Sequence, residues 1–185
     1  MVMSSEQEEL EFLEWKPNGS IKENLKSDWN ANRSTLKGRL LVFCFRLASW
    51  FLRGRIMQYV GFPYLVVYRI AVEWVLGVEI PPLTRIGSGF AIHHGQGIVV
   101  NNRVVIGDNC LIRQGVTLGN RSDKDPYGCP IIENNVNIGA NALVLGRVSI
   151  GDGAVIGAGA VVTRNVDAGD TVVGNPARSI NKESA

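Results

Sequence analysis

His93 and His94 are the two histidines of this 185-residue chain, and they stand side by side in AIHHGQGIVV. An imidazole titrates at a pKa of about 6.5, so it can act as a general base near neutral pH or bind a metal ion. Neighbouring residues on a strand point to opposite faces, so the pair cannot easily share one ion. General-base catalysis and a polar surface role are the alternatives that remain.

The elements that must hold these histidines follow a six-residue period. Glycine often follows the aliphatic residue of each repeat, and 16 of the 21 glycines lie in this half of the chain. The period is interrupted by a two-residue slip after Ile98 and by a longer break between Leu118 and Ile132. The aliphatic residues that keep the period are Ile80, Ile86, Ile92 and Ile98, then Ile106, Ile112 and Leu118, and finally Ile132, Ile138, Val144, Ile150, Ile156 and Val162.

A fixed six-residue period predicts a parallel β-helix, a mainly β fold in which each hexapeptide forms one short strand and one corner. The aliphatic residue of each repeat points inward. The break reads GNRSDKDPYGCPI, and its polar, proline and glycine residues cannot continue a core. We therefore expect a loop extruded from the β-helix at about residues 119–131, and loops on rigid scaffolds often carry function.

The region before the β-helix divides in two. Residues 1–34 are polar and acidic, and we expect a short helix or a mobile arm there. Residues 35–78 carry apolar residues at spacings of three and four, which predicts helices. We expect a turn around Gly54–Gly61 and Pro63 in the first turn of a second helix. Residues 79–185 form the predicted β-helix domain.

Charge and composition narrow the function classes. Residues 36–78 carry six bases and one acid. This charge is too small and the segment too apolar for a nucleic-acid surface, but it suits a face near anionic lipid, a face near an anionic substrate, or a solvated helix face. The apolar stretches there are broken by charges, so we expect no transmembrane helix. The acidic start lacks a signal-peptide pattern, and three scattered cysteines fit a reducing compartment. These features predict a cytoplasmic protein, with peripheral contact at the inner face of the membrane.

The motifs EIPPLTRIGSGFAIHHGQGIVV, VTLGNR, IGANALVLG, IGAGAVVTRNV and GNPAR resemble the hexapeptide-repeat acyltransferases, in particular the serine O-acetyltransferase group. The resemblance implies a left-handed β-helix with three hexapeptides to a coil, a homotrimer, and direct transfer of an acetyl group from acetyl-CoA. In that group an Asp-Ile-His-Pro run precedes a catalytic histidine by about one coil. Here the run begins at Glu79 and the histidine position is His94. The resemblance thus implies His94 as general base and Glu79 as its carboxylate partner.

The same resemblance implies the residues that bind acetyl-CoA and the acceptor. It implies no metal, since the β-helical carbonic anhydrases need three histidines and this chain has two. The expected cofactor-binding residues are Ala140, Ala158, Thr163, Arg164 and Arg178. The expected acceptor-binding residues are His93, Gln96 and Cys129.

The chain departs from the serine enzymes where they hold the charges of serine. Their aspartate before the catalytic histidine is His93 here, and their Arg-His pair after the loop is Gly128 and Cys129. An ammonium and a carboxylate need charged partners when partly buried, so a less charged acceptor is expected. The pattern resembles most the colanic-acid-type acetyltransferases of exopolysaccharide synthesis, whose acceptor is a sugar hydroxyl. A serine acetyltransferase and a catalytically idle β-helix scaffold remain the alternatives.

Overall fold

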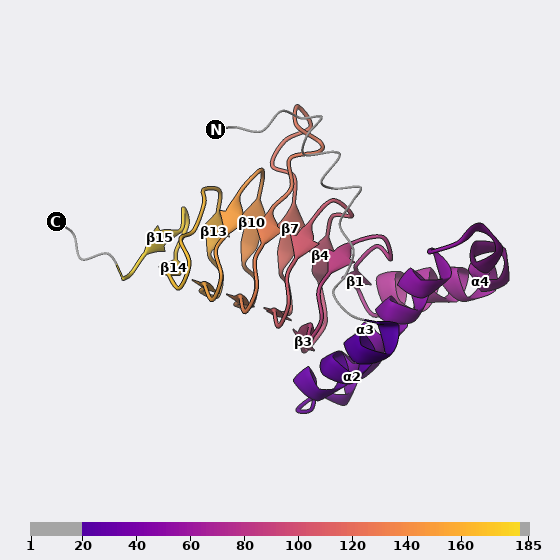
Figure 1. Cartoon of the computed structure of the whole chain (residues 1–185). Coiled ribbons are helices and arrows are strands. Elements are labelled where there is room, and N and C mark those ends of the chain that lie inside the picture. Colours follow the sequence, from indigo (N-terminus) through magenta and orange to yellow (C-terminus); the bar gives the residue numbers. More distant parts are fainter. Residues whose placement is uncertain (1–19, 182–185) are drawn as a thin grey trace.

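The computed structural model describes residues 20–181, which form a helical region followed by a parallel β-helix (Figure 1). The helical elements are α2 (Ile21–Ala31), α3 (Leu36–Phe51), α4 (Arg55–Tyr68) and the π-helical η1 (Arg69–Val75). Ser20 and Glu23 form a capping box that begins α2, so the described part of this segment contains a short helix, one of the two alternatives expected. Residues 1–19 of the expected arm lie outside the described residues.

The start of α4 differs from the sequence expectation. The helix begins at Arg55, so no turn extends over Gly54–Gly61, and Pro63 lies in the helix interior rather than in its first turn. Proline lacks an N–H and loosens the preceding helical turn. The chain nevertheless continues as helix, and it widens into η1 six residues later. The apolar residues from Ile56 onward therefore outweigh the tendency of Pro63 to begin or break a helix.

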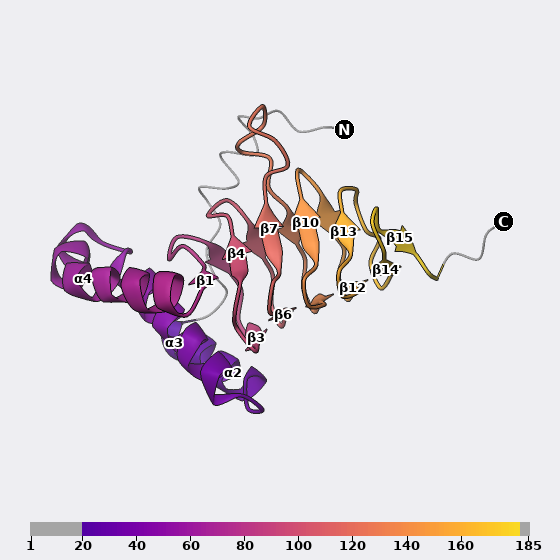
Figure 2. The ribbon, with the colours of Figure 1, turned by 180° about the vertical axis from the view of Figure 1, so that it is seen from behind.

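Three parallel sheets form the three walls of the β-helix (Figures 1 and 2). The first wall consists of β1 (Val78–Glu79), β4 (Ile98–Val100), β7 (Thr117–Gly119), β10 (Leu143–Leu145) and β13 (Val161–Val162). The second consists of β2 (Arg85–Ile86), β5 (Val105–Ile106), β8 (Ile131–Ile132) and β11 (Ser149–Ile150). The third consists of β3 (Ala91–His93), β6 (Leu111–Arg113), β9 (Asn137–Ile138), β12 (Val155–Ile156), β14 (Thr171–Val173) and the antiparallel β15 (Arg178–Ser179).

The aliphatic residues of the repeat stack in columns inside these walls. Ile86 is in register with Ile106, and Ile106 with Ile132 in the next coil. All three are essentially fully buried. The predicted β-helix of hexapeptide repeats is therefore confirmed, and burial of these columns supplies its main stabilisation.

The register places the two-residue slip at a different point from the one expected. Ile92 pairs with Ile112, while Val100 pairs with Leu118. Val100 follows Ile92 by eight positions (100 − 92 = 8). In the next coil, Leu118 follows Ile112 by only six (118 − 112 = 6). The two additional residues lie before Val100, in the corner that follows His93, and not after Ile98. The corner that carries His94 is enlarged.

Polar side chains of α2 and α3 cover the open first coil of the β-helix. Asn32 donates to the carbonyl of Phe90 at 2.8 Å and accepts from the N–H of Ile92 at 2.9 Å. Asp28 accepts from the N–H of Phe90 at 2.9 Å, and Arg46 donates to the carbonyl of Ile86 at 2.7 Å. An uncovered edge would leave these backbone groups unpaired. We call these contacts the helical cap.

Asp28 and Arg46 also form a buried ion pair within the helical cap, with 2.8 Å between Arg46 Nε and Asp28 Oδ2. Burial raises the pKa of the Asp28 carboxyl, although Arg46 and backbone amides act in the opposite direction. Arg46 donates further to the carbonyl of Gly87. The pair is therefore tied into the first coil on both sides, and it fixes α2 and α3 to the β-helix.

Candidate functional site

His94 lies at a corner of the β-helix where the third wall turns into the first, and we call this the histidine corner. It comprises residues 94–97 and the stacked corners beneath them. Backbone hydrogen bonds run down the stack: Gly115 N donates to Gln96 O at 2.8 Å, Asn141 N to Gln114 O at 2.9 Å, and Gly159 N to Ala140 O at 2.8 Å. These bonds join successive corners, from Gln96 to Gly159, into one ridge.

His94 has an unusual backbone conformation, with a φ of 67°. The other non-glycine residues of the described chain with positive φ are three asparagines, the residue type that tolerates this region best. The side chain of His94 is exposed, so its own burial does not impose this conformation. Strained residues of this kind concentrate at functional sites. The backbone of His94 is thus unusual, while its role as a general base stays a prediction.

Helix α3 holds this corner from the inside. Gly95 is buried with a φ of 51°, and a side chain there would collide with Leu41 of α3. Leu41 is itself buried in the core. The exposed imidazole of His94 thus stands on a corner whose backbone is fixed by packing, which is the arrangement that preorganises a catalytic side chain.

His93 is the last residue of β3 and is half-buried. Burial lowers the pKa of its imidazole, and the positive charges of Arg113 and His94 lower it further. Arg113 is its register partner in the next coil and donates to Asn137 Oδ1 at 2.6 Å. His93 is therefore held neutral near pH 7, where it can donate one hydrogen bond and accept another.

Glu79 is exposed on β1, next to β4 in the first wall. Gly77, two residues earlier, faces the backbone of Gly97 in the histidine corner, with 3.7 Å between an ideal Cβ on Gly77 and the Gly97 nitrogen. Glu79 itself is in register with Val99, five residues after His94. Within residues 20–181 no hydrogen bond joins Glu79 and His94, so their partnership stays a prediction.

The expected acetyl-CoA residues fall into separate groups in a single chain. Ala140 and Ala158 lie on successive coils of the histidine corner, as their spacing of 18 residues predicted. Thr163 and Arg164 follow β13 at a different corner, where the first wall turns into the second, and Arg178 lies on β15. The N–H of Ala177, next to Arg178, donates to the carbonyl of Val161 at 2.9 Å, so Arg178 follows a segment that packs on β13.

The surface beside Ala158 fits a slender ligand. A side chain added at Gly159 would meet no atom within 4 Å, and Ala158 itself is exposed. Small residues on an open ridge allow a chain such as pantetheine to approach the backbone closely. Arg164 and Arg178 are both exposed, and their expected contact with phosphates stays a prediction.

Two of the expected acceptor-binding residues also lie on different corners. Gln96 is exposed in the histidine corner, whereas Cys129 ends the extruded loop at the corner between the first and second walls. Burial raises the pKa of the Cys129 thiol to about 11, so the thiol is protonated at neutral pH. A protonated thiol is a poor nucleophile. Cys129 is thus unsuited to carry an acetyl group.

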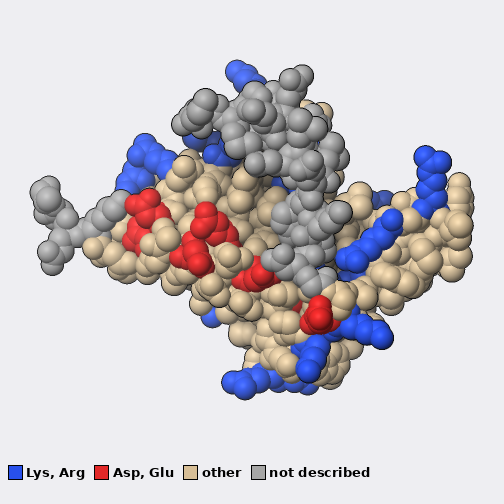
Figure 3. Space-filling model, in the orientation of Figure 1, with Lys and Arg blue, Asp and Glu red and all other residues tan. Residues whose placement is uncertain are grey.

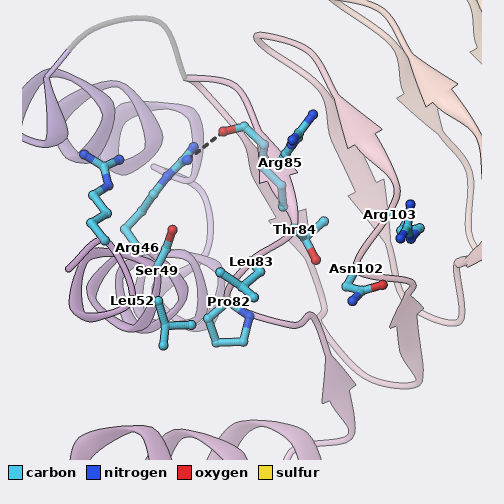
Figure 4. A pocket seen from close by; sticks show the side chains of 11 residues that line it. Arg46, Ser49, Leu52, Pro82, Leu83, Thr84, Arg85, Asn102 and Arg103 are labelled. Carbon is cyan, nitrogen blue, oxygen red and sulfur yellow. Dashed lines mark hydrogen bonds between the residues drawn. The ribbon is translucent and has the colours of Figure 1, made fainter. Parts of the chain in front are cut away.

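The sequence reasoning missed a pocket of about 370 Å³ between α3 and the first two coils (Figure 4). Four arginines contribute to its wall, and among them Arg46 already belongs to the helical cap. Burial lowers the pKa of Arg85, and the nearby charge of Arg103 adds to this effect. Arg103 stacks on Tyr127 of the extruded loop, 4.1 Å from the ring centroid. No local motif marks this pocket, because its arginines come from three distant segments.

The fold and the site together define a class. The walls repeat hexapeptides, one corner presents an exposed histidine on a rigid backbone, and the ridge below it is lined by small residues. Among residues 20–181 no three His, Cys, Asp or Glu side chains gather as a metal-binding group. These features define a hexapeptide-repeat transferase, and residues 129–164 match the family described as "Bacterial transferase hexapeptide (six repeats)".

The chain belongs to the acetyltransferases of this hexapeptide family. It is 40% identical over 155 residues to WcaB of Escherichia coli K12, which is assigned as an acetyltransferase of colanic acid biosynthesis. The match covers 82% of this chain and 95% of WcaB. It is also 42% identical over 137 residues to a serine acetyltransferase of Synechococcus elongatus, covering 74% of this chain and 54% of that protein.

Solved structures agree with this family. The apoenzyme of soybean serine acetyltransferase superposes with a TM-score of 0.76 at 34% identity, covering 87% of this chain and 69% of that one. The serine acetyltransferase of Vibrio cholerae gives a TM-score of 0.74 at 31% identity, with 89% and 67% covered. The chain is therefore an acetyltransferase of the same fold as the serine enzymes and is similar in sequence to WcaB over nearly the whole of WcaB.

Proposed function

We propose that the protein transfers an acetyl group from acetyl-CoA to a sugar hydroxyl in exopolysaccharide biosynthesis, with His94 as general base. The observation that carries this proposal is how much of each relative's length the chain matches. The chain matches 95% of WcaB but only 54% of the Synechococcus serine acetyltransferase, at similar identity. The chain thus shares nearly the full extent of the colanic acid relative, while nearly half of the serine relative has no counterpart in the match.

The chain's part in the reaction begins with proton removal. The exposed imidazole of His94 accepts the proton of the acceptor hydroxyl, and Glu79 accepts the other ring N–H and balances the positive charge that forms. Bound acetyl-CoA supplies the acetyl thioester. The acceptor oxygen forms the new ester bond, the C–S bond breaks, and His94 returns its proton to the departing CoA sulfur. No covalent enzyme intermediate is needed, in keeping with the raised pKa of Cys129.

The acceptor side of the proposal depends on neutral groups. His93 is held neutral by burial and by neighbouring positive charge, and Gln96 is exposed in the same corner. Both offer neutral donors and acceptors, which suit a sugar hydroxyl. Serine's ammonium would instead meet His93, close to the positive charge of Arg113. This environment supports a sugar acceptor over serine.

We further propose that the working form is a homotrimer with its sites between neighbouring β-helices. Ala158 and Thr163 lie on different corners of one chain, as do His94 and Cys129. A second chain can bring one molecule's histidine corner against another's extruded loop, which would complete each site. Sedimentation equilibrium should give three times the monomer mass, and a stable monomer with full activity would contradict the trimer.

A serine acetyltransferase is the second candidate, favoured by the soybean and Vibrio structures and by the Synechococcus sequence. An idle scaffold is the third reading, and the strained, exposed His94 argues against it. The deciding experiment measures CoA release with L-serine, nucleotide sugars and lipid-linked sugars. Loss of charge-assisted hydrogen bonds costs about 1.5–3 kcal/mol each, so two losses put serine on the order of 10³ below the sugar in kcat/KM.

A kcat/KM for L-serine equal to or above that of every sugar would overturn the sugar proposal and leave acetyl transfer intact. If the protein bound acetyl-CoA but released CoA with none of these acceptors, the scaffold reading would be favoured. We place the enzyme in the cytoplasm, where acetyl-CoA is made. Contact with the membrane is a separate proposal, since it concerns the helices and not the transfer site.

A further inference from the structure

Helix α4 and η1 expose apolar side chains on the side that a surface helix normally covers with polar ones. Ile56 and Tyr59 are 79% and 85% exposed, and Trp74 and Val75 are 73% and 75% exposed. The further large apolar residues exposed on these elements are Val60, Phe62, Val66, Val67 and Ile70. We call this set, with the four residues above, the apolar face.

The buried side of the same helix is narrow. Gly61, Tyr68 and Val72 are buried, and Gly61 packs so closely on Phe51 of α3 that a side chain would collide with its ring. The Tyr68 hydroxyl donates to the carbonyl of Ile80 at 2.8 Å. The helix is thus anchored by one stripe, while its bulkiest apolar residues point away from the protein. An amphipathic helix of a protein in water alone has the opposite arrangement.

The charges around the apolar face are almost entirely positive. Arg55 begins α4 and Arg53 precedes it, both exposed. Arg69 and Glu73 pair with each other at 3.3 Å, and Glu73 is the one acid between residues 55 and 76. In Figure 3 the end of the molecule formed by α4 is tan and blue, whereas the red side chains gather along the β-helix. The face therefore has no strong repulsion against an anionic partner.

We propose that the apolar face of α4 and η1 docks on the surface of an anionic lipid bilayer, lying in the plane of the headgroups. Such helices join a large apolar face to basic residues and to aromatic residues with polar tips, and Tyr59 and Trp74 supply the latter. Basic residues at the rim meet lipid phosphates. No helix within residues 20–181 is long and apolar enough to cross a bilayer, so the contact is on the surface.

Docking of the apolar face would fix the orientation of the β-helix relative to the bilayer. In both ribbon views α4 lies at the helical end of the molecule, remote from the C-terminal strands (Figures 1 and 2). The arginine-bearing pocket includes Leu52 and Arg53, which immediately precede α4. The first coils of the β-helix would then lie nearest the membrane, and the C-terminal coils farthest from it. This docking does not depend on which acceptor the enzyme uses.

Vesicle flotation of the full chain tests the proposal. We expect binding to vesicles that contain phosphatidylglycerol, weaker binding to phosphatidylcholine alone, and loss with rising salt. Ile56→Ser should lower the partition coefficient about tenfold, since an isoleucine side chain leaves the apolar phase. The matched control is Ile180→Ser, an isoleucine that is 61% exposed outside the helices and should float as wild type.

Charge is tested in the same way. Arg55→Gln should weaken binding about fivefold, whereas Arg121→Gln, exposed on the extruded loop, should not. Equal flotation of Ile56→Ser and wild type would overturn the proposal. So would an absence of wild-type flotation, and a smaller assembly for Ile56→Ser in sedimentation would then show that a second copy covers the face. CoA release with a soluble acceptor should be unchanged in Ile56→Ser, which keeps docking and catalysis separable.

Discussion

Replacing His94 with asparagine should remove activity and stabilise the protein at the same time. The imidazole is exposed, so its removal costs no packing. Its backbone has a φ of 67°, a conformation that the described chain otherwise gives to glycine and to Asn109, Asn135 and Asn141. Asparagine adopts this conformation at a lower cost than histidine does. The substitution therefore relieves strain while it deletes the proposed base.

The two effects differ greatly in size. Loss of a general base lowers kcat by about 10²–10⁴-fold. A left-handed residue costs about 1–2 kcal/mol, and asparagine relieves part of that, so we expect a gain of about 0.5–1 kcal/mol in unfolding free energy. For a chain of this length the gain raises Tm by about 1–4 °C. The assay pairs CoA release, followed with a thiol reagent, with calorimetry of the same sample.

His93→Asn is the matched control, since the same substitution falls one residue earlier on ordinary strand backbone. It should raise the KM for the acceptor and give no increase in Tm. If His94→Asn retained more than about a tenth of the wild-type kcat, His94 would not be the base. If its Tm fell below that of His93→Asn, the argument from backbone strain would be wrong.

Four further outcomes are expected. Glu79→Gln should lower kcat without changing the KM for acetyl-CoA, because an amide cannot balance an imidazolium, and an unchanged kcat would remove Glu79 from the mechanism. Asn32→Ala should cost about 2–4 kcal/mol in urea unfolding by leaving two buried backbone groups unpaired, whereas the exposed Asn30→Ala should cost less than about 0.5 kcal/mol, and equal losses would contradict the helical cap. Cys129, with a thiol pKa of about 11, should react with iodoacetamide at neutral pH at least about tenfold more slowly than a free thiol, and rapid labelling in mass spectrometry would show that it is not buried. The lowered pKa of His93 means that below about pH 6.5 the unfolded chain binds a proton that the folded chain resists, so urea midpoints should fall with acidification less steeply in His93→Gln than in wild type, and parallel curves would exclude this linkage.

The β-helix could be predicted from the sequence because its cause is local and repeated. Each inward aliphatic residue, such as Ile106 and Ile132, fills one coil and pairs with its equivalent in the next. The slip was misplaced because Ile98 and Val100 are both buried, so either continues an aliphatic period. Only the pairing of Val100 with Leu118 shows that the extra residues enlarge the corner of His94.

The helical cap and the pocket could not be predicted, and the reason is distance along the chain. Asn32 and Phe90 are 58 residues apart, and neither carries a motif for the other. The arginines of the pocket, among them Arg85 and Arg103, are likewise separated in sequence and meet only through the coiling. The proposed site meets a related limit, since Ala158 and Thr163 lie on either side of β13 and the sequence alone does not say whether another chain lies beside them.

The helical cap has a consequence for what happens when many copies of the chain are present together. The exposed end of a parallel β-helix is a head-to-tail surface, and repeated stacking of such ends does not close on itself but grows into a fibre. Asp28, Asn32 and Arg46 occupy the backbone groups through which another coil would add. The antiparallel β15 covers the other end of the third wall. Both ends of the solenoid are thus protected against the addition of another chain, so a chain with a damaged helical cap should be more prone to polymerise end to end.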